Sequence, residues 1–97
     1  MSEYDNRQYR LMLDRIEKYQ HKKLKLRTLI GDLEGLLGCL QEVDENWKEE
    51  FLKAWGVLEE VYSFAIYEEK KELSEKDKEL IHKAITELGN MVKQQLQ

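Results

Sequence analysis

The stretch that decides the fold is residues 47–67, which read WKEEFLKAWGVLEEVYSFAIY. At about 100° per residue, a helix over this stretch has one apolar face and a second apolar flank beside it. The face comprises Trp47, Phe51, Ala54, Trp55, Leu58, Tyr62 and Ala65, and the flank comprises Val57, Val61 and Phe64. A helix that is apolar around so much of its circumference must be covered on two sides. The sequence therefore predicts a central helix buried by other helices.

The polar side of this central helix is a narrow stripe that we expect to face solvent. Its members are Glu49, Lys53, Gly56, Glu60, Ser63 and Tyr67. Asp44 precedes the helix as a good N-cap, and acidic residues in the turns that follow are favoured by the helix dipole. That explanation does not extend to Glu59 and Glu60 in the middle of the helix, or to Glu68 and Glu69 near its end.

The composition indicates one small helical domain that spans residues 1–97. The chain has no proline and only five glycines, so helix breakers are scarce. No apolar run approaches the roughly 20 residues needed to span a bilayer. The first residues lack the basic start and apolar run of a signal peptide, and the single cysteine allows no intrachain disulfide. We therefore expect a cytoplasmic protein without a membrane segment.

Apolar residues also recur at helical spacing before and after the central helix. We expect a first helix that begins near Asp5 or Asn6, either of which could cap it, and a second over residues 24–40. Ser74 is the predicted cap of the last helix. Residues 19–23 are polar but contain no glycine or proline, so residues 5–40 could form one bent helix or two. The predicted fold is a small all-α, antiparallel up-and-down bundle of three to four helices.

A line of glycines runs along the second predicted helix, opposite its leucine stripe. Gly31, Gly35 and Gly38 are four and three residues apart, and each costs a helix about 0.8–1 kcal/mol relative to alanine. The favoured interpretation is that the first helix packs there, or that the helix is locally irregular. The alternative is a groove where another backbone approaches closely, such as the seam of a homodimer.

Residue chemistry gives no support for catalysis or for a cofactor. His21 and His82 have no second histidine or cysteine at ligand spacing, and Cys39 has no neighbouring base to activate it. The Glu-x-x-His pattern of di-iron bundles occurs once, from Glu79 to His82, where two copies are needed. We therefore expect a protein that is not an enzyme and holds no metal or cofactor.

Charge is distributed very unevenly along the chain, whose net charge is −4. Residues 1–30 hold eight basic and four acidic groups, whereas residues 31–69 hold eleven acidic groups and only two lysines. The acidic middle disfavours nucleic-acid binding and favours a basic protein partner.

A family resemblance rests on the central helix and its flanks. Residues 43–51, VDENWKEEF, followed by Trp55 and by LEEVY at 58–62, resemble a group of short bacterial proteins, and residues 33–37 and 73–77 fit the same pattern. The resemblance covers roughly residues 24–92. These small acidic helical proteins are similar to the immunity proteins of contact-dependent growth inhibition and related polymorphic toxin systems.

The resemblance implies a function by binding alone. Such a protein neutralises a cognate toxin C-terminal domain, often a nuclease with a basic cleft, by covering its active site or its substrate surface. The residues that we expect to meet a basic partner are on the central helix: Glu49, Glu60 and Tyr67, helped by Glu59, Glu68 and Glu69. The alternative function is a self-associating helical structural or adaptor protein without catalysis.

Overall fold

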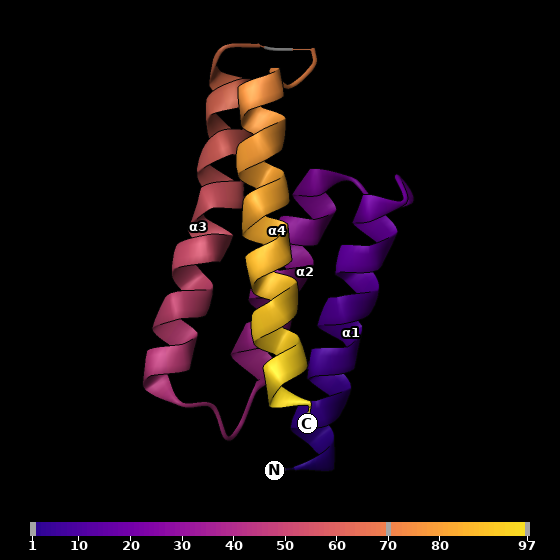
Figure 1. Cartoon of the computed structure of the whole chain (residues 1–97), viewed down its shortest axis with the longest axis vertical. Coiled ribbons are helices and arrows are strands. Elements are labelled where there is room, and N and C mark those ends of the chain that lie inside the picture. The colour runs from indigo at the N-terminus through magenta and orange to yellow at the C-terminus, as the bar shows by residue number, and fades with distance from the viewer. Residues whose placement is uncertain (1, 70, 97) are drawn as a thin grey trace.

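The computed structural model describes residues 2–69 and 71–96, which form an all-helical bundle. Its helices are α1 (Glu3–Gln20), α2 (Leu26–Cys39), α3 (Glu45–Tyr67) and α4 (Glu75–Gln95). They run alternately up and down, and each packs against two neighbours in the cyclic order α1, α2, α3, α4 (Figure 1). The predicted antiparallel up-and-down bundle is confirmed, with four helices.

One continuous hydrophobic core lies between the helices. The central helix α3 contributes Phe51 and Leu58, both with no exposed surface. One face of α4 is buried along its length, and it comprises Ile81, Ala84, Ile85, Leu88 and Val92. Phe64 departs from the prediction, because its side chain is 53% exposed rather than covered. Its turn of α3 lies near the end of the helix, where the bundle is thinner (Figure 1).

The start of α1 differs from the prediction. Ser2 caps the helix, and its Oγ accepts a hydrogen bond from the main-chain N–H of Asp5 at 3.0 Å. Asp5 is fully buried, and its carboxylate accepts hydrogen bonds from the main-chain N–H groups of Gln41 and Glu42 at 2.9 and 2.8 Å. The prediction that Asp5 or Asn6 caps the helix was wrong, because the carboxylate of Asp5 satisfies amides of the α2–α3 loop instead.

Residues 21–25 separate α1 from α2, so residues 5–40 form two helices. The main-chain N–H of Lys23 donates to the carbonyl of Lys18 at 2.8 Å, and that of Lys22 donates to the carbonyl of Tyr19 at 3.0 Å. This pair of hydrogen bonds is the Schellman ending of a helix, which requires a left-handed residue after the cap. Lys22 takes that conformation with φ 61° where glycine is more usual.

The glycine line of α2 faces solvent. Gly31, Gly35 and Gly38 are exposed, and a Cβ added at any of them would meet no atom within 4 Å. The interpretation that the first helix packs on this line was wrong: α1 packs on the leucine side of α2, where Arg15 Nε donates to Asp32 Oδ2 at 3.1 Å.

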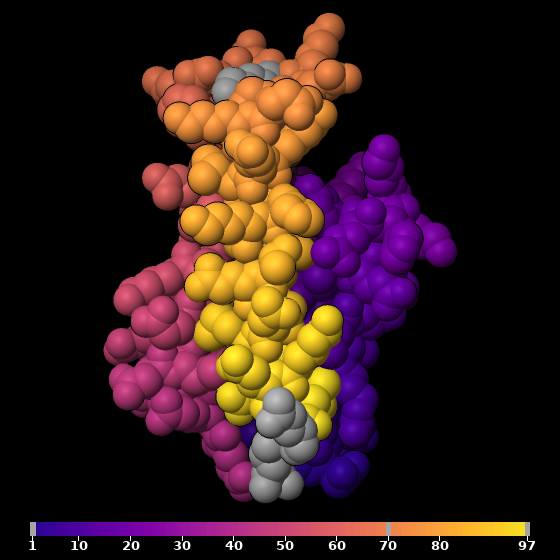
Figure 2. All heavy atoms as spheres, in the orientation of Figure 1, coloured from indigo at the N-terminus to yellow at the C-terminus, as the bar shows by residue number. Residues whose placement is uncertain are grey.

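The two helical hairpins have unequal lengths. Helices α3 and α4 have 23 and 21 residues, whereas α1 and α2 have 18 and 14. The end of the α3–α4 hairpin therefore projects beyond the α1–α2 turn, and the space-filling view shows a notch beside that turn (Figure 2).

Candidate partner-binding surface

The N-terminus of α3 is fixed by its predicted cap. Asp44 Oδ2 accepts a hydrogen bond from the main-chain N–H of Trp47 at 3.1 Å, as expected for an N-cap aspartate. Glu45 follows in the first turn, where the helix dipole favours negative charge. The cap fixes where the helix begins, and therefore fixes the position along the helix axis of every residue on its outer face.

Two indole N–H groups fix the rotation of α3 about its axis. Trp55 Nε1 donates to the carbonyl of Ile30 on α2 at 2.9 Å, and Trp47 Nε1 donates to the carbonyl of Met91 on α4 at 3.3 Å. The Trp47 ring also packs edge-on against Tyr9, with centroids 5.7 Å apart. The tryptophans thus join α3 to both helices that flank it, and the opposite side of α3 faces solvent.

The predicted polar stripe lies on that outer side. Glu49, Glu60 and Tyr67 are exposed, and Tyr67 is 85% exposed. The positions 49, 60 and 67 share one side of a 3.6-residue helix, and the line from Glu49 to Tyr67 is about 27 Å long at 1.5 Å per residue. The structure therefore presents these three side chains as one long row.

The acidic residues beside this row differ in their surroundings. Glu59 Oε1 accepts a hydrogen bond from the hydroxyl of Ser63 at 3.2 Å, and Glu50 pairs with Lys53 at 3.1 Å. Within residues 2–69 and 71–96, no lysine or arginine side chain pairs with Glu49 or Glu60. The outer face of α3 therefore carries negative charge that its own lysine, Lys53, neutralises only in part.

The C-terminal end of α3 gathers further features of the surface. Glu68 is the C-cap, and Glu69 follows with φ 54°, a left-handed conformation that turns the chain toward α4. Ile66 is 57% exposed, so it and Phe64 add apolar area near Tyr67. The helical periodicity of the sequence predicted neither residue as part of this surface. The relevant signal was their place in the last turns of α3, the longest helix, which project beyond the α1–α2 hairpin (Figure 1).

The histidines and the cysteine are at the surface of the molecule. His21 and His82 are exposed, and so is the free thiol of Cys39. In the part of the chain that the structure describes, no three His, Cys, Asp or Glu side chains lie close enough together to hold a metal ion. No helix of that part is long and apolar enough to cross a membrane.

Comparison of the chain with protein-family models, with curated proteins and with solved structures finds no match.

Proposed function

We propose that this protein acts as an immunity protein, which binds a cognate toxin domain in the cytoplasm of the producing cell and blocks its active site or substrate surface. The observation that carries the proposal is the outer face of α3, an exposed row about 27 Å long that joins Glu49 and Glu60 to Tyr67. The resemblance of residues 24–92 to such proteins supports the same function.

The chemistry of this face suits a basic partner. Acidic side chains on a binding protein attract a basic surface over a distance, which raises the association rate and helps to exclude wrong partners. Tyr67 adds an aromatic ring of the kind that is enriched at interface hot spots. A nuclease domain with a basic cleft is the toxin class that fits best, and inhibition needs no catalysis by the inhibitor.

The test uses the toxin domain encoded by the adjacent reading frame. Co-expression with this protein should restore growth, and Glu49→Lys combined with Glu60→Lys should weaken the complex at low salt, mainly through slower association. The matched control is Glu34→Lys with Glu87→Lys, which makes the same charge change at exposed sites on α2 and α4. Equal affinity of the two double variants would remove α3 as the site, and failure of co-expression to protect would remove the function.

A second candidate function is self-association as a helical adaptor. The observation that favours it is the uncovered line of Gly31, Gly35 and Gly38, which would let another helix approach closely. Light scattering over a wide concentration range separates the two proposals, because a chain that stays monomeric at high concentration is not a self-associating adaptor.

A further inference from the structure

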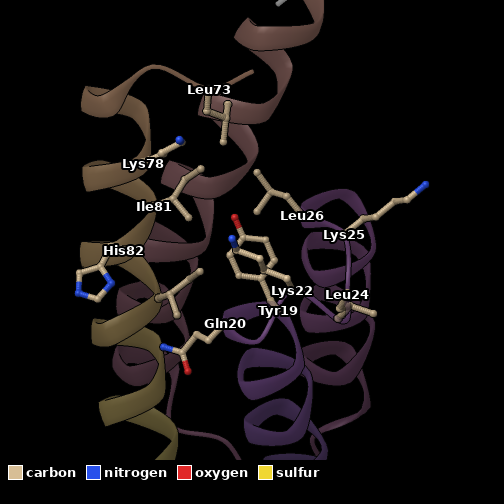
Figure 3. A pocket seen from close by; sticks show the side chains of 11 residues that line it. Tyr19, Gln20, Lys22, Leu24, Lys25, Leu26, Leu73, Lys78, Ile81 and His82 are labelled. Atoms are coloured by element: carbon tan, nitrogen blue, oxygen red, sulfur yellow. The ribbon is translucent and has the colours of Figure 1, made fainter. Parts of the chain in front are cut away.

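A groove lies between the α1–α2 turn and α4, at the notch left by the unequal hairpins (Figure 3). Its volume is about 720 Å³, within the range of roughly 300–1,000 Å³ that is usual for small-molecule sites. Most of its walls are apolar side chains from the end of α1, from α2 and α4, and from the adjoining turns. The apolar and aromatic members are Tyr19, Leu24, Leu26, Leu73, Ile81 and Ile85.

Among the residues that the structure describes, every charged side chain that lines this groove is basic. Of the lining residues that the structure describes, none is acidic, although the chain holds 20 Asp and Glu residues. Lys22 and Lys78 extend toward the space between the helices, whereas Lys25 and His82 point away from it (Figure 3). In the described part of the chain no carboxylate pairs with Lys22, and Lys78 has only a surface contact of 3.7 Å with Glu75.

The start of α2 adds to the positive potential. Lys25 is the N-cap of α2, and its side chain accepts no hydrogen bond from the first amides of this helix. Lys25 and Leu26 both line the groove. Because an uncapped helix N-terminus favours an anion, it acts in the same direction as the two lysines.

The hydroxyl of Tyr19 supplies a neutral donor in the same place. Its side chain reaches into the space between α4 and the start of α2 (Figure 3). Burial raises the pKa of the Tyr19 phenol above its ordinary value, so the hydroxyl stays protonated at neutral pH and can donate a hydrogen bond. An apolar floor thus adjoins two ammonium groups and a hydroxyl donor.

We propose that this groove binds a free fatty acid, with the acyl chain against Leu26, Leu73 and Ile81 and the carboxylate at Lys22, Lys78 and Tyr19. The choice of a single-chain anionic amphiphile follows from the charge complementarity of the lysines and from a volume that suits one small molecule. The groove shares no residue with the outer row of α3. Fatty-acid binding and toxin binding can therefore succeed or fail independently.

The first test is calorimetric titration with saturated fatty acids from octanoate to dodecanoate, each below the concentration at which it forms micelles. The affinity should rise with chain length, by up to about fourfold for each added CH₂ that is buried. In a ¹H–¹⁵N spectrum, the amides of Leu24, Leu26 and Ile81 should shift most. Affinity that is independent of chain length, or shifts confined to other surfaces, would overturn the proposal.

The second test separates the carboxylate from the chain. Lys22→Gln with Lys78→Gln should weaken decanoate binding about tenfold, the loss of one to two charge-assisted hydrogen bonds, and leave decanol binding unchanged. The matched control, Lys23→Gln with Lys83→Gln, removes two exposed lysines that do not line the groove and should bind decanoate normally. Equal decanoate affinity of the two double variants would contradict the site.

A third variant places an acid in the floor of the groove. Leu26→Glu should abolish decanoate binding. Because the half-buried Leu26 packs against the hydrophobic core, circular dichroism and urea denaturation must first show that the variant keeps the helical fold. Two other occupants appear as distinct results. A dimer that Leu26→Glu dissociates, without decanoate binding to the wild type, identifies a second copy of the chain. Binding to phosphatidylglycerol vesicles but not to free decanoate identifies a membrane surface. Either result overturns the fatty-acid assignment.

Discussion

The buried carboxylate of Asp5 accepts a hydrogen bond from the main-chain N–H of Gln41 at 2.9 Å, across 36 positions of sequence. A second hydrogen bond, from the N–H of Glu42 at 2.8 Å, makes Asp5 the link between the start of α1 and the α2–α3 loop. Asp5→Ala leaves both amides without this acceptor, so we expect the free energy of unfolding to fall by about 2–4 kcal/mol. Asp5→Asn keeps one acceptor oxygen, so the free energy of unfolding should fall by about half as much as in Asp5→Ala. Urea denaturation of the two variants measures the difference, and equal stability of wild type and Asp5→Ala would contradict this role.

Trp55 should stabilise the fold through its indole N–H as well as through its ring. Trp55→Phe removes the donor to the carbonyl of Ile30 while keeping an aromatic side chain, and should lower the free energy of unfolding by about 1–2 kcal/mol. Trp47→Phe removes a longer hydrogen bond, of 3.3 Å, so the loss of that hydrogen bond should lower the free energy of unfolding by less. Chemical denaturation compares the two, and a smaller loss for Trp55→Phe than for Trp47→Phe would argue against this account of how α3 is oriented.

Replacement of the exposed glycines of α2 should stabilise the monomer. A Cβ at Gly35 meets no atom within 4 Å, so Gly35→Ala should raise the free energy of unfolding by about 0.8–1 kcal/mol through helix propensity alone. Thermal denaturation at low protein concentration measures the gain. If Gly35→Ala instead lowers stability in a concentration-dependent manner, the glycine line is a contact between copies of the chain.

Buried phenols should make the protein sensitive to alkaline pH. Burial, and to a lesser extent the charge of Asp5, raises the pKa of Tyr9 above the ordinary 10.0. Above pH 10 the unfolded chain therefore loses the Tyr9 proton more readily than the folded chain. The contribution of Tyr9 to the free energy of unfolding is thus fully present below pH 10 and declines as the pH rises above it. Urea titrations from pH 7 to pH 11 should show this decline, and Tyr9→Phe should reduce it. An identical decline in wild type and Tyr9→Phe would show that other groups cause it.

Periodicity in the sequence was sufficient for the parts of the fold that depend on local rules. The buried face of α3, its N-cap Asp44 and the cap of α4 by Ser74 are all as predicted, because side-chain spacing and capping are properties of a short segment. The outer position of the Glu49–Glu60–Tyr67 row follows from the same spacing. That these residues bind a partner stays a prediction.

The features that the sequence analysis missed depend on tertiary structure. The end of α1 was uncertain because a lysine, Lys22, takes the left-handed position that glycine usually marks. Asp5 was interpreted as a cap because its real partners are far away in sequence. Phe64 is exposed, and a groove lies at the α1–α2 turn, because the α3–α4 hairpin is longer than the α1–α2 hairpin. Relative helix lengths and offsets of this kind cannot be read from periodicity.

The unequal hairpins also predict how the molecule fluctuates. The last turn of α3 and the first turn of α4 lie in the part of the α3–α4 hairpin that projects beyond the α1–α2 turn (Figure 1), so local opening there should cost less free energy than opening of the turns around the fully buried Phe51 and Leu88. Hydrogen exchange should therefore be fastest in this projecting segment. The row on α3 would then have a rigid half at Glu49 and a labile half at Tyr67, and a partner that engages both halves loses some affinity to the ordering of the second.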